Sequence, residues 1–149
     1  MGADYFIENS NVIINLIYAD KILNSLDFIA DDGKSIKENL TDCLEDYGWK
    51  LKSSNKRQLT FIFEPDDDIE FDWSVYEQLA PFLVDGSFVE ENSGELPDEY
   101  YENDEDIRGF VVGLIEKGKV KRQLYAVTEK EDGKINRVFV RDLSEEDWA

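Results

Sequence analysis

The sequence predicts an α+β fold in which an antiparallel sheet of about five or six strands packs against two or three helices. In three runs between residues 108 and 141, apolar and polar residues alternate, and short glycine-containing turns join the runs, as in antiparallel hairpins. Residues 16–28 and 36–47 instead carry apolar side chains at helical spacing. A chain of 149 residues that is 42% hydrophobic can build one core, so we expect a single compact domain over residues 1–149.

The first third of the chain predicts a short strand and a helix. Residues 4–8 fit a strand, and 9–11 fit a turn because they combine two asparagines with a serine. Residues 12–14 fit either a strand or the residues that lead into a helix, and the local sequence does not decide between the two. The helix is expected over residues 16–28, and the side chains that share its apolar face are Ala19, Ile22, Leu23, Leu26 and Ile29.

The second helix has clear signals at both ends. Ser35 and Glu38 have the spacing of a capping box, in which the serine hydroxyl accepts a hydrogen bond from the backbone N–H three residues on and the glutamate carboxylate accepts one from the backbone N–H of the serine. Gly48 supplies a C-terminal stop. We therefore expect a helix over residues 36–47.

The centre of the chain predicts two strands and a short helix. Alternating apolar residues indicate strands at 49–51 and 59–63, joined by a polar loop over 52–56. Ser74–Glu77 is a second candidate capping box, and it predicts a helix that runs to about residue 83.

The last third predicts a strand, a long loop and two hairpins. Residues 87–91 fit a strand, and the polar stretch 92–106 is expected to be a loop. Alternation then predicts strands over 108–116, 119–128 and 136–141, with turns at 117–118 and 131–133.

The charge is concentrated in one part of the chain. The protein has 35 acidic and 16 basic residues, for a net charge of −19. Residues 58–107 contain 17 acidic residues and neither lysine nor arginine. Aromatic and aliphatic residues run through the same segment, which a disordered acidic tail would lack. We therefore expect the carboxylates to be held on a folded surface.

Composition argues against most catalytic sites. Histidine is absent, which removes Ser-His-Asp triads, Cys-His dyads and histidine-ligated zinc. Cys43 is the only cysteine, and it lies on the apolar stripe of a predicted helix. A glycosidase needs only two carboxylates, but no sequence motif that would indicate substrate binding accompanies the acids. We expect no enzyme, no catalytic residues and no cofactor.

The densest acidic cluster, residues 66–72, does not fit a calcium loop. An EF-hand requires glycine at its sixth position and glutamate at its twelfth, where this chain has Phe71 and Glu77. A solvated turn ahead of a helix explains the cluster, because the helix dipole stabilises negative charge near a helix N-terminus. We expect no metal site, although the cluster leaves binding of a divalent cation open.

The acids and two adjacent tyrosines of this segment are the candidate partner-binding residues. Tyr100 and Tyr101 are aromatic residues in a hydrophilic stretch, which is typical of an interface hot spot. The complete set is Asp66, Asp67, Asp68, Glu70, Asp72, Glu90, Glu91, Asp98, Glu99, Tyr100, Tyr101, Glu102, Asp104, Glu105 and Asp106.

The charge predicts a basic protein as the partner. A chain of net charge −19 repels phosphates, so we expect no direct binding of nucleic acid. Carboxylates at positions i and i+2 of a strand lie about 6.8 Å apart, in the range of successive phosphates. In charge, the chain resembles the acidic nucleic-acid mimics of phages and mobile elements, including some anti-CRISPR and anti-restriction proteins. That resemblance implies an inhibitor of a nucleic-acid-binding enzyme or nuclease.

Two other functions fit the same pattern. An immunity protein that neutralises a basic toxin or nuclease would use the same electrostatics. An adaptor domain whose acidity only maintains solubility is also consistent with the composition. The sequence shows neither a membrane-spanning run nor a signal peptide, so we expect a soluble, cytoplasmic protein that does not bind membranes.

Overall fold

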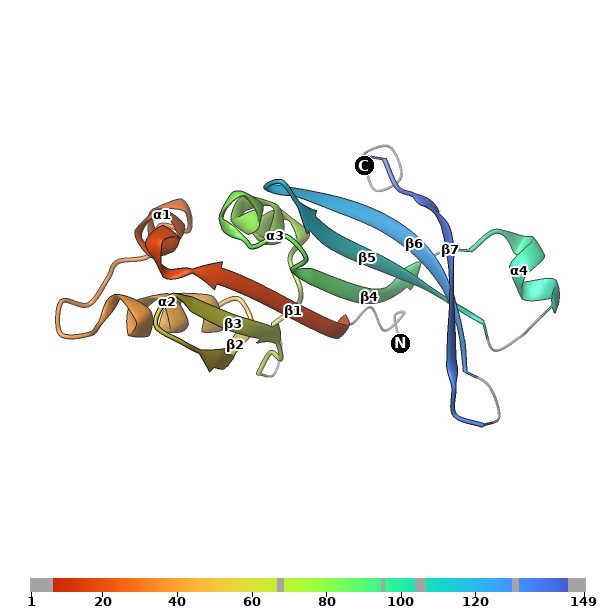
Figure 1. Cartoon of the computed structure of the whole chain (residues 1–149), viewed down its shortest axis with the longest axis horizontal. Coiled ribbons are helices and arrows are strands. Elements are labelled where there is room, and N and C mark those ends of the chain that lie inside the picture. The colour runs from red at the N-terminus through yellow and green to blue at the C-terminus, as the bar shows by residue number, and fades with distance from the viewer. Residues whose placement is uncertain (1–6, 67–68, 95, 104–106, 130–131, 145–149) are drawn as a thin grey trace.

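A computed structural model describes residues 7–66, 69–94, 96–103, 107–129 and 132–144. Within these residues the chain forms one antiparallel sheet of seven strands, in the order β2-β3-β1-β4-β5-β6-β7, with four α-helices (Figure 1). The predicted α+β class is confirmed, whereas the predicted numbers of strands and helices are too low. Among the described residues, no helix is both long and apolar enough to cross a membrane.

The elements follow one another along the chain as strands interrupted by short helices. The strands are β1 (Ile7–Asn15), β2 (Trp49–Ser54), β3 (Gln58–Phe63), β4 (Phe88–Gly94), β5 (Arg108–Glu116), β6 (Lys119–Glu129) and β7 (Ile135–Asp142). The α-helices are α1 (Ala19–Ser25), α2 (Ile36–Glu45), α3 (Trp73–Leu79) and α4 (Asp98–Asn103). Two 3-10 turns, η1 (Leu16–Tyr18) and η2 (Ala80–Phe82), flank α1 and α3.

The predicted capping box of α2 is present. Ser35 Oγ accepts from the Glu38 N–H at 3.1 Å, and Glu38 Oε1 accepts from the Ser35 N–H at 3.1 Å. Gly48 has φ = 93° after the helix, a conformation that glycine adopts without a steric penalty. The two ends of α2 are therefore set by local chemistry.

The N-terminal strand is longer than predicted. Residues 9–11, predicted as a turn, lie inside β1, which also contains the undecided residues 12–14. β1 is a central strand: residues 9–11 pair with β4, and residues 12–15 pair with β3. Ser10 is buried, and its hydroxyl accepts from the Phe63 N–H at 2.8 Å. Tertiary pairing thus overrides the turn propensity of this stretch.

Helix α3 begins differently from the prediction. The N-cap is Asp72, whose Oδ1 accepts from the N–H groups of Ser74 and Val75 at 2.8 and 3.4 Å. The predicted cap, Ser74, lies within the first turn. Aspartate and serine are both good caps, and the one that precedes the first helical residue takes the role.

The predicted loop 92–106 is largely ordered structure. β4 extends to Gly94, and residues 98–103 form α4. Residues 95 and 104–106 lie outside the described residues. Asp98 and Glu99 occupy the first turn of α4, where carboxylates are favoured by the helix dipole.

The main core lies where α1, α2 and α3 pack on one face of the sheet. Its largest fully buried side chains include Phe61, Ile14, Leu44 and Tyr76. Helix α3 approaches β5 closely at Gly113, where a Cβ atom would lie 2.7 Å from the Trp73 ring. The Tyr76 hydroxyl donates to the Gly113 carbonyl at 2.8 Å at the same place.

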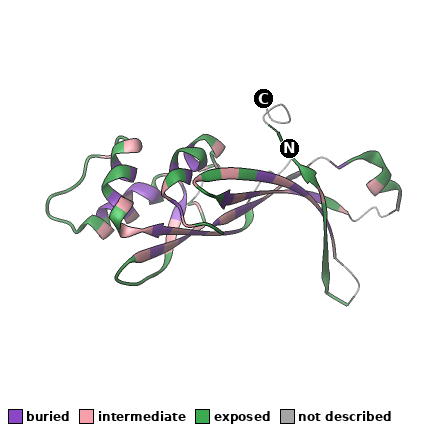
Figure 2. Cartoon of the chain, turned by 45° about the horizontal axis from the view of Figure 1, so that its top comes forward, coloured by how far each residue is buried: buried purple, intermediate pink, exposed green. Residues whose placement is uncertain are grey.

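A smaller core lies farther along the sheet. Leu96, Leu124 and Ala126 are buried together, with Tyr100 and Val140 packed against them. Figure 2 shows the contrast between the two regions, because burial is concentrated beneath α1–α3, whereas β7 is almost entirely exposed.

Candidate functional site

The acidic residues of segment 58–107 are distributed over separate parts of the fold. Asp66, Glu70 and Asp72 lie between β3 and α3, whereas Asp98, Glu99 and Glu102 belong to α4, which Figure 1 shows at the far end of the sheet. The candidate residues therefore do not form one continuous surface. Asp67, Asp68, Asp104, Glu105 and Asp106 lie outside the described residues.

One predicted surface carboxylate, Glu90, is inside the fold. Its side chain is 6% exposed and forms an ion pair with both terminal nitrogens of Arg137, with Nη2 2.7 Å from Oε2. Glu90 lies on β4 and Arg137 on β7, with β5 and β6 between them. Neighbouring strands are about 4.8 Å apart, so the contact requires the sheet to coil strongly. Glu90 thus stabilises the curvature of the sheet and is not available to a partner.

A second group of charges connects α3 to the sheet. The Arg122 guanidinium lies 4.2 Å from the Trp73 ring centre, and its Nη2 is 3.0 Å from Glu77 Oε1. Burial lowers the pKa of Arg122, and the charge of Glu77 opposes that effect. Trp73 Nε1 also donates to Glu91 Oε1 at 3.3 Å. Glu91, another predicted surface residue, is therefore half-buried and engaged within the fold.

Several carboxylates surround Lys50 on β2. Lys50 Nζ lies 2.7 Å from Asp66 Oδ1. This hydrogen bond is the main cause that raises the pKa of Lys50, and the charges of Asp66, Glu64 and Glu45 raise it further. Carboxylates from the end of α2 and from the segment after β3 therefore lie close to one amine.

The neighbouring Tyr47 lies close to further acids. Burial is the main cause that raises the pKa of its hydroxyl, and negative charge adds to it. The groups that supply that charge are Cys43, Asp46, Asp27 and Asp72. The carboxylates among them come from the ends of α1 and α2 and from the start of α3.

We call these six residues the acidic surface: Asp27, Glu45, Asp46, Glu64, Asp66 and Asp72. All six are exposed, and they come from three stretches of the chain: the end of α1, the end of α2 and the connection from β3 to α3. Glu45 and Asp46 lie at the C-terminal end of α2, where the helix dipole disfavours negative charge. The helix dipole therefore does not explain why acids stand at these two positions.

The candidate residues taken from the sequence include only two of these six, Asp66 and Asp72. Glu64 lies within residues 58–107 but is not among them. Asp27, Glu45 and Asp46 lie outside residues 58–107, in a part of the chain where basic residues nearly balance the acids. The available signal was an acidic pair, Glu45 and Asp46, at the end of a clearly predicted helix. Glu70 is exposed in the segment that follows Asp66.

The acids and tyrosines of α4 form a separate feature. Asp98, Glu99 and Glu102 are exposed. Tyr100 packs against the smaller core, so it has a structural role. Tyr101 is 41% exposed, and its hydroxyl accepts from the Leu96 N–H at 3.4 Å. Of the two tyrosines, Tyr101 is the one that a partner can reach.

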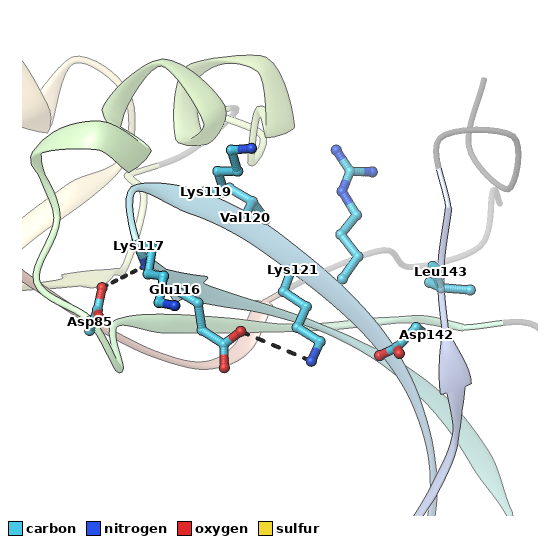
Figure 3. A pocket seen from close by; sticks show the side chains of 9 residues that line it. Asp85, Glu116, Lys117, Lys119, Val120, Lys121, Asp142 and Leu143 are labelled. Atoms are coloured by element: carbon cyan, nitrogen blue, oxygen red, sulfur yellow. Dashed lines mark hydrogen bonds and ion pairs between the residues drawn. The ribbon is translucent and has the colours of Figure 1, made fainter.

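A shallow groove of about 760 Å³ lies beside the β5–β6 turn (Figure 3). Its walls carry both signs of charge, and Lys121 Nζ is 4.0 Å from Glu116 Oε2. Figure 3 shows Lys119 and Lys121 extending in different directions. These amines do not converge on a point where one anion would bind. The lining residues are Asp85, Glu116, Lys117, Lys119, Val120, Lys121, Arg122, Asp142 and Leu143.

Other reactive groups in the described part of the chain are either buried or dispersed. Burial raises the pKa of the Cys43 thiol to about 11, so the thiol is protonated at neutral pH. Among the described residues, no three His, Cys, Asp or Glu side chains are grouped so as to hold a metal ion. The acidic surface is therefore the chemically most distinctive feature of the described residues.

Comparisons with protein-family models, with curated proteins and with solved structures found no match to this chain.

Proposed function

We propose that this protein is a non-enzymatic inhibitor that binds a basic surface of a partner protein through its acidic surface. The observation that carries the proposal is the convergence of exposed carboxylates from three chain segments around Lys50 and Tyr47. Lys50 offsets part of this negative charge through its ion pair with Asp66. The remaining negative charge favours association with a basic surface of a partner.

The partner class follows from the same charges. Complementary potentials accelerate association and make it sensitive to salt. Lysine- and arginine-rich surfaces that would attract this chain are typical of proteins that bind nucleic acid. The acidic surface would compete with nucleic acid for such a surface, and a nuclease or another nucleic-acid-binding enzyme is the expected target.

The proposed footprint differs from the set that the sequence predicts. It keeps Asp66 and Asp72, and it adds Glu64 and the acids at the ends of α1 and α2. It leaves out Glu90 and Glu91, because the sheet and α3 engage their carboxylates. The acids of α4 are too distant to belong to the same footprint (Figure 1).

Two variants with equal charge changes test the proposal. One variant replaces Glu45, Asp46 and Glu64 of the acidic surface by lysine. Its matched control replaces Asp98, Glu99 and Glu102 of α4 by lysine. Wild type and both variants are immobilised, exposed to a bacterial lysate at low salt and eluted with a salt gradient.

The location of the charge, and not its amount, is expected to decide the result. Wild type and the α4 variant should retain the same basic protein, and duplex DNA should release it. The acidic-surface variant should lose that protein while keeping its circular dichroism spectrum. Equal retention by both variants, or a retained protein that DNA does not release, would contradict the proposal.

A further inference from the structure

Two buried apolar residues belong to neither core. Phe110 on β5 is 5% exposed and Val127 on β6 is 6% exposed, but both lie outside the two groups of buried residues that pack under the helices. Side chains alternate along a strand. Gly113 faces α3 and Ala126 belongs to the smaller core, so Phe110 and Val127 point to the opposite face of the sheet. The helices of the two cores therefore do not cover them.

The ion pair between Glu90 and Arg137 lies on this opposite face. The register pairs Arg137 with Val127, and it places Glu90 on the same face as Phe110. The two charged side chains meet although β5 and β6 separate their strands. The sheet must therefore curl toward this face, which brings the ion pair over β5 and β6. Arg108 adds to the cover, because its guanidinium lies 5.5 Å from the Phe110 ring centre.

β7 is connected to the rest of the sheet by few contacts. Seven of its eight residues are exposed (Figure 2), and among the described elements it packs extensively only on β6. The ladder between β6 and β7 also contains a register shift. On one face the ion pair connects β7 to β4, and on the other face Val140 and the adjoining Leu143 pack against the smaller core. Segments with few buried apolar contacts open at a lower free energy than the core of a protein.

We propose that β7 is a strap that separates from β6 while the rest of the sheet stays folded, and that the ion pair between Glu90 and Arg137 is its latch. In the closed state the latch keeps the sheet curled over Phe110 and Val127. In the open state these two side chains and the backbone edge of β6 are accessible, whereas the core beneath α1–α3 is unchanged. The strap lies far from α1 and α2 (Figure 1), so this inference goes beyond the proposed function and does not depend on it.

Hydrogen exchange of the full chain tests whether the strap opens separately. The backbone amides of β7 should exchange at least about a hundredfold faster than those of β3, after correction for their intrinsic rates. Arg137→Ala should raise the exchange of β7 by roughly thirtyfold or more, because only the closed state loses the ion pair. Lys134→Ala removes an exposed positive charge from the same hairpin and is the matched control. It should change the exchange of β7 by less than about threefold.

A substitution in the core beneath α1–α3 should produce the opposite pattern. Ile22 on α1 is fully buried in that core. Ile22→Val should raise the exchange of β3 by about two- to tenfold, because those amides exchange when the core unfolds. The exchange of β7 should not change, because the core stays folded when the strap opens.

Thiol labelling of a Val127→Cys chain measures what the opening exposes. The introduced thiol replaces a buried side chain beneath the ion pair, so a reagent should reach it only in the open state. The native thiol of Cys43 is buried in the core beneath α1–α3 and is the internal control. The thiol at position 127 should react at least about tenfold faster than that of Cys43. Adding Arg137→Ala should accelerate it further.

Each measurement has a result that would overturn the proposal. Equal protection of β7 and β3 would show that the sheet opens as one unit, as would an Ile22→Val chain in which the exchange of both strands rises together. Unchanged exchange of β7 in the Arg137→Ala chain, or an equal rise in the Lys134→Ala chain, would show that the ion pair is not the latch. A thiol at position 127 that reacts no faster than Cys43 would show that separation of β7 does not uncover this face.

Discussion

Among the described residues, 18 buried residues form the core beneath α1–α3, whereas three form the core between β6 and α4. The first region is held together mainly by apolar burial. The second depends on two arginines from its own strands, Arg122 and Arg137, which reach α3 and β4. Where helices cover a sheet, hydrophobic packing suffices, and where they do not, charged side chains with long stems connect its parts.

The largest expected effect is a loss of stability when the same substitution, leucine to alanine, is made in each core. Leu59→Ala on β3 should lower the free energy of unfolding by about 4–5 kcal/mol, and Leu124→Ala on β6 by about 2–3 kcal/mol. Both leucines are fully buried, but a cavity in the smaller core can collapse more easily. Urea unfolding measures both values. Equal losses would show that the two cores are packed with similar rigidity.

The next effect concerns the ion pair that maintains the coiling of the sheet. Arg137→Ala leaves the Glu90 carboxylate buried without its partner and should cost about 2–4 kcal/mol. Adding Glu90→Gln should restore part of that loss, because it removes the charge that needs compensation. Denaturant unfolding of the single and double variants tests this. If the second substitution adds its own full cost, the pair is not energetically coupled.

The core beneath α1–α3 should also make stability depend on alkaline pH. Burial raises the pKa of the Cys43 thiol from 9.0 to about 11, so the unfolded chain loses this proton first as the pH rises. Stability should therefore fall between pH 9 and 11, with a contribution from Cys43 of at most about 2 kcal/mol. Cys43→Ala should flatten that fall. An unchanged slope in thermal unfolding over this pH range would assign the loss to other groups.

The smallest effect concerns α3, which connects the two regions. Asp72→Ala removes the observed N-cap and should cost about 1 kcal/mol. Ser74→Ala removes only the cap that the sequence predicts, and it should change stability by a few tenths of a kcal/mol at most. Thermal unfolding of the two variants distinguishes the caps. A larger loss for Ser74→Ala would reverse the assignment.

Elements with strong local signals could be predicted from the sequence. The capping box of Ser35 and Glu38 and the alternation of β5 and β6 depend on neighbouring residues alone, and both are confirmed. β1 was predicted only in part, and α4 was not predicted. The turn-forming residues 9–11 of β1 are held extended by pairing with β4. α4 is a short helix rich in acids, and its Tyr100 packs on a core built from β6.

The candidate site could be predicted only in part, for a related reason. Counting charges along the chain located Asp66 and Asp72, but it could not show that Glu45 of α2 lies beside Lys50. Nor could it show that Glu90 is paired with Arg137, which is 47 residues away in sequence. Charge density along a sequence finds acids, whereas tertiary structure decides which of them face solvent.

Because Arg122 contacts Trp73, the intrinsic fluorescence of Trp73 can report whether β6 and α3 stay together. The Trp73 indole lies between a guanidinium from β6 and the rings of Phe71 and Tyr76. Trp49, by contrast, is enclosed in the core with Phe63. If β6 separates from α3 while the helical region stays folded, Trp73 changes its surroundings and Trp49 keeps them. The emission of a chain with Trp49 and Trp148 replaced by phenylalanine, which leaves Trp73 as its only tryptophan, would then report the separation of the two regions before global unfolding.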